Sequence, residues 1–158
     1  MKREGLSAAG LVAESKAHRA KQEQYDDDLL WYIDRIRDTH DLYHVLTGYG
    51  RDALGEASLL GYTHSQHKGR GISFIAYMGA REISKFAPRD MDIHAVVAEG
   101  RRHGKVAKRI IEQDIVELLR EPIDEARARL NIGKPQLYRD TARRLQEFNS
   151  DEPILATA

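Results

Sequence analysis

The sequence predicts an all-α protein, a single-domain helical bundle of about six to seven helices. Its 158 residues contain only four prolines, and the long segments between turn signals are rich in Ala, Leu, Glu, Arg and Lys, which favour helix. No segment alternates polar and apolar residues for long, and no Asn-Gly hairpin turn is present. The length fits one domain with a real core, since domains usually have roughly 100–200 residues.

Local signals place four helices in the first half of the chain. Ser7 caps the first, and the acidic triplet at 26–28 suits the start of the second. Thr47-Gly48-Tyr49-Gly50 interrupts the pattern, and Ala87-Pro88 ends the most apolar segment, which we expect in the core. We therefore expect helices over 7–23, from the acidic triplet to Leu46, over 52–61 and over 71–86, with a polar loop over 63–70.

The second half predicts one long helical pattern followed by two shorter helices. The long pattern covers 90–119 and would bend at Gly100 or Gly104. Pro122 suits the first turn of a helix to Leu130, and Pro135 opens a last helix to about Phe148. We expect one helical domain over 1–150 and a flexible tail over 151–158.

The composition excludes several classes of function. With 25 Lys plus Arg against 25 Asp plus Glu, the formal net charge is zero, which argues against a nucleic-acid-coating protein. The chain has no Cys, which rules out disulfides, thiolate zinc fingers, iron–sulfur clusters and cysteine nucleophiles. Any metal site must therefore use the nitrogens of the seven His and carboxylate oxygens. No segment has the roughly 20 apolar residues of a membrane span, so a cytoplasmic protein is expected.

The second predicted helix carries two histidines on its apolar side. Leu29, Ile33 and Ile36 form a stripe at spacings of four and three, and the same stripe continues to His40 and His44. Because four residues advance an α-helix by about 400°, the two imidazoles lie one turn apart on nearly the same side. A buried imidazole is costly without a partner, so the pair is a candidate for metal binding.

Two carboxylates accompany the histidine pair. Asp41 lies about 100° from His40 and about 60° from His44 around the same helix. Glu56 sits on the apolar side of the next helix, where a carboxylate is costly unless it is paired or binds a metal. Two glycines between the helices allow the chain to turn so that Glu56 faces the histidines. These four residues offer donors that zinc accepts, and also iron or manganese.

Each of these residues has a simpler interpretation when taken alone. A His pair at i and i+4 is more often a surface or capped pair, and Glu56 would then be an ion-pair partner of Arg51 or Lys68. Tyr43 and Tyr49 flank the pair, and each would either stack on a substrate ring or pack with its hydroxyl in water. Only the four-residue combination on successive helices favours a metal site.

The stretch HDLYHVLTGYGRDALGE resembles a motif of a known family. It is similar to the His-Asp-x-x-His motif, followed after eleven residues by Glu, of the Coq-four family of ubiquinone (coenzyme Q) biosynthesis proteins, and residues 45–55 separate His44 from Glu56. Gly104-Lys105-Val106-Ala107-Lys108 is similar to the family's Gly-Arg/Lys-x-Ala-Lys run, and the stretch from Glu121 to Glu125 follows at a family-like distance. The resemblance spans about residues 5–132.

The resemblance implies an all-α protein bound to the ubiquinone biosynthetic complex, peripheral on the inner face of a membrane. The family is linked to removal of the C1 carboxyl group from polyprenylated hydroxybenzoate precursors, with C1 oxidation, which would make the chain a carboxy-lyase. It carries a metal, usually taken as zinc, so His40, Asp41, His44 and Glu56 would be the ligands by position. The implied partners are a polyprenylated aromatic lipid substrate and other ubiquinone biosynthesis proteins, without nucleic acid, and a homodimer is one oligomeric state to consider.

The sequence departs from the family in three places. Members usually have a further helical region upstream of what is Met1 here, so this is either a short form or an internal start. The aromatic residue common in the family's late helix is Ile115 here, and the Pro that often follows its Lys is Arg109. These changes leave the metal motif intact.

A basic run in the second half supplies candidates for substrate binding. Arg101, Lys105 or Lys108 would meet the substrate carboxylate, and Tyr43 would contact its ring. Lys105 and Lys108 are three residues apart and would share a helix face. The simpler interpretation is that these cations are solvated beside acidic neighbours.

Two other functions are compatible with the motif. A non-catalytic helical scaffold would bind polyprenyl lipid and organise other enzymes, with a structural metal held by four protein ligands. An HD-type metal phosphohydrolase would need an earlier His and a later Asp, for which His18 and Asp90 or Asp92 are available. A coordination position filled by water favours catalysis, and a closed tetrahedron favours the scaffold.

Overall fold

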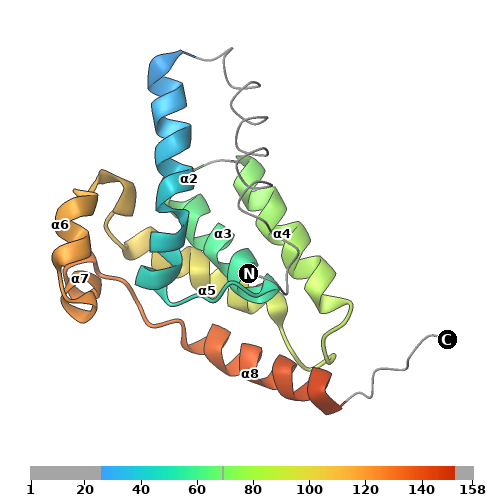
Figure 1. The fold of residues 1–158 in the computed structure, drawn as a ribbon. Coiled ribbons are helices and arrows are strands. Elements are labelled where there is room, and N and C mark those ends of the chain that lie inside the picture. Colours follow the sequence, from blue (N-terminus) through green and yellow to red (C-terminus); the bar gives the residue numbers. More distant parts are fainter. Residues whose placement is uncertain (1–25, 69, 152–158) are drawn as a thin grey trace, which may run out of the picture. The chain divides into compact units, whose positions relative to one another are not determined.

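The computed structural model describes residues 26–68 and 70–151, and within these ranges it contains helices and no strands (Figure 1). The all-α prediction is confirmed. The predicted helix over 7–23 and residues 152–158 of the predicted tail lie outside the described residues, whereas Asp151, the first residue of that tail, is the last residue of a helix. The elements are α2 (Asp27–Thr47), α3 (Ala53–His67), α4 (Arg70–Ser84), α5 (Ile93–Val106), the 3₁₀ helix η1 (Ile110–Glu112), α6 (Ile115–Arg120), α7 (Ile123–Leu130) and α8 (Gln136–Asp151).

Contacts divide the chain into two compact units, Met1–Thr39 and His40–Ala158. In the first unit, α2 begins at the predicted acidic triplet, where the Asp26 carboxylate accepts a hydrogen bond from the Leu29 N–H at 2.8 Å. Two further acids occupy the first turn, where the helix dipole favours negative charge. All four residues of the expected metal site lie in the second unit.

Helix α3 is the centre of the second unit and packs against both α4 and α5 (Figure 1). A Cβ on Gly100 or Gly104 of α5 would collide with the backbone of Ser58 or Tyr62, so α3 and α5 meet at backbone contact. Close contact of this kind excludes water from between the two helices. The buried apolar side of α3 consists of Leu54, Ala57, Leu59 and Tyr62.

The expected loop over 63–70 was wrong, because α3 continues to His67. Its polar residues satisfy backbone groups instead of turning to water. The Ser65 hydroxyl donates to a carbonyl of α5 at 2.9 Å, and the buried Gln66 amide bonds the backbone at and after the end of α5. Lys68, in the left-handed conformation with φ of 57°, ends the helix.

The expected long helix over 90–119 was also wrong. Helix α5 continues through its two glycines and ends at Val106. There Gln66 donates to the Gly104 carbonyl at 3.0 Å and accepts from the Ile110 N–H at 3.1 Å. The Asp114 carboxylate then caps a new helix, α6. Because the chain leaves the helix after Val106, Lys105 and Lys108 do not share a helix face.

The expected core position of the most apolar helix was wrong in part. Ala76 and Ala80 of α4 are buried, but Phe74, Ile75 and Tyr77 are 65%, 57% and 56% exposed. The core lies between α3 and α5 instead, because their glycines allow closer packing.

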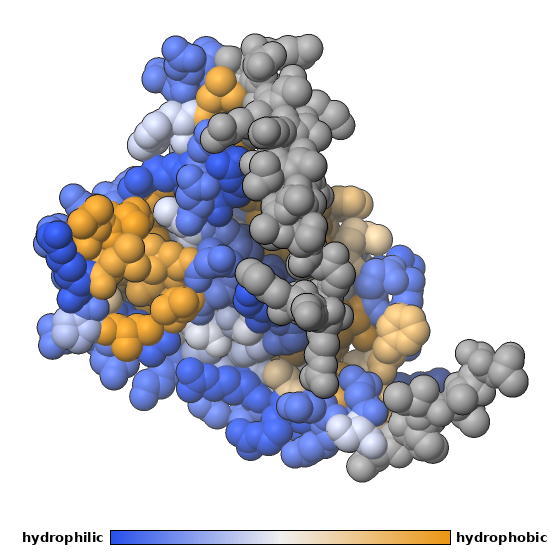
Figure 2. Space-filling view, in the orientation of Figure 1, coloured by the Kyte–Doolittle hydropathy of each residue, from blue (hydrophilic) through white to orange (hydrophobic). Residues whose placement is uncertain are grey.

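Besides the exposed apolar side chains of α4, an exposed apolar surface lies over α6 and α7, where Figure 2 shows hydrophobic residues gathered. Its exposed side chains include Val116, Leu119 and Ile123. Among the helices in the described ranges, none is both long and apolar enough to cross a bilayer.

The two helices expected after the late prolines are confirmed as α7 and α8. Pro122 is the N-cap of α7 rather than a first-turn residue. The start of α8 is capped from another helix, since the buried Glu99 carboxylate of α5 accepts hydrogen bonds from the Leu137 and Tyr138 N–H groups at 3.0 and 3.1 Å. This contact anchors α8 to α5.

Candidate metal centre

The end of α2 is held by a cation and a glycine turn. The Arg127 guanidinium donates to the carbonyl oxygens of Val45 and Leu46 at 3.0 and 2.9 Å, which satisfies groups that have no partner within the helix. Gly48 then turns the chain with φ of 77°, a conformation that favours glycine. The direction in which the chain leaves His44 is therefore fixed.

The start of α3 lies directly against the turn. The Asp52 carboxylate caps the helix by accepting from the Leu54 and Gly55 N–H groups at 3.1 and 3.0 Å. A Cβ on Gly55 would collide with the Gly50 carbonyl, so only glycine allows this first turn to pack so closely. Glu56 is the next residue, and the packing brings its carboxylate to the histidines of α2.

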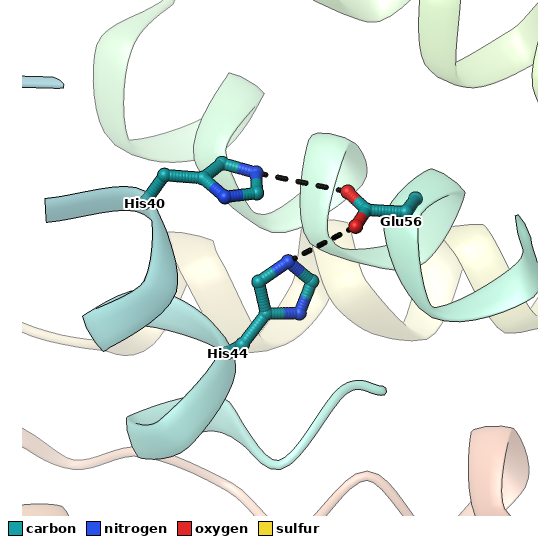
Figure 3. Close-up of side chains that lie close together, drawn as sticks. All are labelled: His40, His44 and Glu56. Atoms are coloured by element: carbon teal, nitrogen blue, oxygen red, sulfur yellow. Dashed lines mark ion pairs between the residues drawn. The ribbon is translucent and has the colours of Figure 1, made fainter. Parts of the chain in front are cut away.

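Three side chains converge where the two helices meet, as Figure 3 shows. Glu56 Oε2 lies 3.6 Å from His40 Nε2, and Glu56 Oε1 lies 3.3 Å from His44 Nε2. The His40 and His44 rings are 4.8 Å apart between centroids. One ligand atom from each of these residues lies within 4.8 Å of the others, the only such group of three among the described His, Asp and Glu.

The orientation of His44 is set by a backbone group. Its Nδ1 lies 3.0 Å from the Tyr49 carbonyl oxygen, which can only accept, so Nδ1 carries the proton and donates. The other ring nitrogen of His44, Nε2, faces Glu56. Metal-binding histidines usually donate their other ring N–H to an oxygen in this way.

The surroundings of the His44 Nε2 atom fit a bound cation. It is buried in a side chain that is 7% exposed, and it has no hydrogen-bond partner among the described residues, although Glu56 Oε1 is close. Both atoms are rich in electrons, so positive charge between them, from a proton or a metal ion, would stabilise this arrangement. Two ligand atoms about 2.0 Å from a tetrahedral zinc ion are about 3.3 Å apart, which matches the 3.3 Å between His44 Nε2 and Glu56 Oε1.

Asp41 lies apart from the other three expected ligands. Its side chain is 83% exposed, and its Oδ1 atom lies 3.7 Å from Nδ1 of His40, the nitrogen that faces away from Glu56. This position suits an outer partner that orients the His40 ring.

The expected substrate-binding residues are spread over several elements. Arg101 lines an open groove of about 620 Å³ between α3, α4 and α5, together with Phe74 and Tyr77. Lys105 and Lys108 are exposed at and beyond the end of α5. Within the described ranges, none of the three cations has a hydrogen bond or ion pair with His40, His44 or Glu56.

Tyr43 is buried rather than open to a substrate. Its hydroxyl lies 3.3 Å from Nε2 of His67, and its ring packs edge-on against Tyr62. Burial, together with the nearby Arg109 charge, lowers the pKa of His67 below its ordinary value. The structure therefore places Tyr43 in the packing between α2 and α3.

The residues considered for a phosphohydrolase site have other contacts. Asp90 forms an ion pair with Arg144 at 2.5 Å, which lowers the pKa of its carboxyl group. Asp92 caps α5 by accepting from the Ala95 N–H at 2.9 Å. His18 lies outside the described residues.

The helical fold and the two-imidazole, one-carboxylate cluster define the class, a helical protein with a candidate divalent-metal centre. Residues 14–136 match the family described as "Coenzyme Q (ubiquinone) biosynthesis protein Coq4", and the chain belongs to this family. The resemblance drawn from the motif is thereby confirmed.

Curated relatives carry the same description. The chain is 27% identical over 129 residues to "Ubiquinone biosynthesis protein coq4, mitochondrial" of Penicillium rubens, a match that covers 80% of this chain and 44% of the relative. It is 32% identical over 120 residues to the protein of that name from Ajellomyces capsulatus, covering 74% of this chain and 42% of the relative. The chain thus spans less than half the length of these relatives. No solved structure gives a significant match.

Proposed function

We propose that the chain is a metal-dependent carboxy-lyase of ubiquinone biosynthesis, which removes the C1 carboxyl group from a polyprenylated hydroxybenzoate. Two observations support the proposal: membership of the Coq4 family, and the buried His44 Nε2 that faces Glu56 without a hydrogen-bond partner among the described residues. The second carries the metal-binding part.

His40, His44 and Glu56 would hold the ion, most simply zinc, although iron or manganese accept the same donors. When bound, the ion would supply positive charge that stabilises the electron pair released as carbon dioxide leaves. In the reaction, the bond between C1 and the carboxyl carbon breaks, the pair stays on C1, and a proton takes the place of the carboxyl group. Within this site, His44 is held in the ligand tautomer by the Tyr49 carbonyl.

The number of ligands favours catalysis over a structural metal. Catalytic zinc sites typically use three protein ligands and leave a position for water or substrate, whereas structural sites use four. The cluster supplies three, since Asp41 is exposed and turned toward the far nitrogen of His40. The exposed fractions of His40 and Glu56, 47% and 40%, leave the cluster open to a ligand.

Arg101 remains the proposed contact for an anionic group of the substrate. Its guanidinium has no ion-pair partner among the described residues, and the groove that it lines is mostly apolar. A cation beside Phe74 and Tyr77 suits a molecule with both an anionic and an aromatic part. Lys105 and Lys108, which are exposed and away from this groove, are weaker candidates.

The polyprenyl part of the proposed substrate indicates where in the cell the protein would work. A polyprenyl chain partitions into a bilayer, so the chain would work as a peripheral protein at a membrane face, next to other ubiquinone biosynthesis proteins. The names of the curated relatives place those proteins in mitochondria.

The proposal is tested by carbon dioxide release from a carboxyl-labelled prenylated hydroxybenzoate, with purified, zinc-loaded protein. We expect release by the wild type, loss of release in Glu56→Gln, and unchanged release in the control Lys85→Ala, which removes an exposed cation paired with Glu82. Mass analysis of the product shows whether C1 gains hydrogen, as proposed, or a hydroxyl group, which would require an oxidant. A folded, metal-loaded wild type that releases no carbon dioxide would overturn the proposal and favour the scaffold.

A further inference from the structure

One side chain of α8, Tyr138, forms hydrogen bonds and a ring contact with the segment between α2 and α3. The Tyr138 hydroxyl donates to Oδ2 of Asp52 at 2.5 Å and accepts from the Gly50 N–H at 2.8 Å. Its ring packs edge-on against Tyr49, with centroids 5.4 Å apart. Tyr138 therefore contacts three of the residues that lie between His44 and Glu56.

Those contacts act on the groups that place the metal ligands. The Tyr49 carbonyl fixes the tautomer and direction of the His44 ring. The other oxygen of Asp52 caps α3 at Leu54 and Gly55, immediately before Glu56. The Tyr138 hydroxyl thus holds the segment between α2 and α3. The two ends of this segment set the distance between His44 and Glu56.

Tyr138 itself is held firmly. Its side chain is 6% exposed, and its backbone N–H donates to the buried Glu99 carboxylate of α5. Burial and the hydrogen bond to Asp52 raise its pKa to about 12, so the hydroxyl keeps its proton at neutral pH. The chain of contacts runs from Glu99 through Tyr138 to Asp52.

We propose that Tyr138 is a positioning residue for the metal centre. It contacts none of the ligand side chains directly, but it holds the backbone that brings His44 and Glu56 within 3.3 Å. Tyr138 lies beyond residues 14–136, so the family match does not assign it a role. The inference rests on the proposed metal binding, and outer-shell partners of metal ligands typically affect affinity by about 10- to 100-fold.

The test compares the zinc affinity of two Tyr→Phe variants of the full chain by competition with a chelator. Tyr138→Phe removes the hydroxyl that forms hydrogen bonds with Asp52 and Gly50, and we expect zinc to bind at least about tenfold more weakly. The control is Tyr62→Phe, which removes a fully buried hydroxyl that has no hydrogen-bond partner among the described residues. Its zinc affinity should equal that of the wild type.

A second comparison separates positioning from general loss of stability. Leu118→Ala leaves a cavity at a buried position on α6, so it lowers the free energy of unfolding without removing any contact of Tyr138 with the α2–α3 segment. We expect it to leave zinc affinity unchanged, while Tyr138→Phe also alters the visible absorption of the cobalt-loaded protein, which reports ligand geometry. Equal zinc affinity and equal cobalt spectra in Tyr138→Phe and wild type would overturn the inference. A wild type that binds no zinc would instead overturn the proposed function.

Discussion

The α2–α3 junction and the basic run over 101–109 both drew attention in the sequence, and they differ in the structure. At the junction, two helices joined by five residues, 48–52, bring His40, His44 and Glu56 within 4.8 Å of one another. In the basic run, Arg101 faces a groove, and Lys105 and Lys108 point to solvent from different elements. The first is a cluster of converging side chains and therefore a candidate site, and the second is a set of separate charges.

The difference between these two regions shows under which conditions the spacing of residues along the chain predicts that they lie close together in space. At the junction, a short turn with its own glycine and N-cap signals leaves the two helices little freedom, so residues within about two turns of it come together. The basic run has no such local constraint, because a contact with distant Gln66 decides where its helix ends.

Removing a ligand should separate the two regions most strongly. We expect His44→Ala to weaken zinc binding by more than about 100-fold, since losing a ligand exceeds the effect of losing an outer-shell partner. Metal affinity measured by competition with a chelator checks this. His94→Ala, a histidine on α5 outside the cluster, is the control, and equal affinities in both variants would remove the distinction between the regions.

Disturbing the packing of the junction should have the next largest effect. In Gly55→Ala the new methyl group meets the Gly50 carbonyl, so we expect a loss of about 1–3 kcal/mol of unfolding free energy, with weaker zinc binding as Glu56 moves. Urea unfolding with and without zinc measures both. Gly71→Ala is the control, because nothing lies within 4 Å of its Cβ. Similar stability in the two variants would show that the junction tolerates movement.

Asp41 offers a finer test of which residues belong to the cluster. Because its exposed carboxylate faces the far nitrogen of His40, Asp41→Asn should weaken zinc binding by no more than about tenfold, less than Glu56→Gln. Parallel titrations of the two variants decide the order. A larger loss in Asp41→Asn would make Asp41 a ligand, as the resemblance implied.

The smallest effects are expected in the basic run. Lys105→Ala and Lys108→Ala remove exposed charges, so each should change the free energy of unfolding by less than about 0.5 kcal/mol and leave zinc affinity unchanged. Urea unfolding and the same titration check both. A marked fall in zinc affinity in either variant would join this region to the site.

The parts of the fold that local signals determine could be predicted from the sequence. The acidic triplet, the glycine turn after Thr47 and the prolines before α7 and α8 all mark element ends in the structure. The ends of α3 and α5 could not be predicted, because each depends on Gln66 and the backbone of the other helix. The exposure of α4 also depends on what packs beside it, which its own apolar pattern does not show.

The candidate site divides in the same way. The helical spacing of His40 and His44 and the short connection to Glu56 were sufficient to predict their convergence. The role of the Tyr49 carbonyl could not be predicted, since every residue has one, and Tyr138 is too distant in sequence for any spacing rule. The helical angles alone did not distinguish Asp41 from the other expected ligands. In the structure it differs from them because Glu56 approaches the opposite nitrogen of His40.

The central claim is that His40, His44 and Glu56 bind one divalent ion. X-ray absorption at the zinc edge, combined with metal analysis of the purified chain, tests it most directly. We predict about one zinc ion per chain, with two imidazole nitrogens among its ligands and the remaining positions filled by oxygen. In Glu56→Gln the ion should be lost or its shell altered. Zinc far below one per chain in folded protein, or a shell without imidazole, would contradict the account.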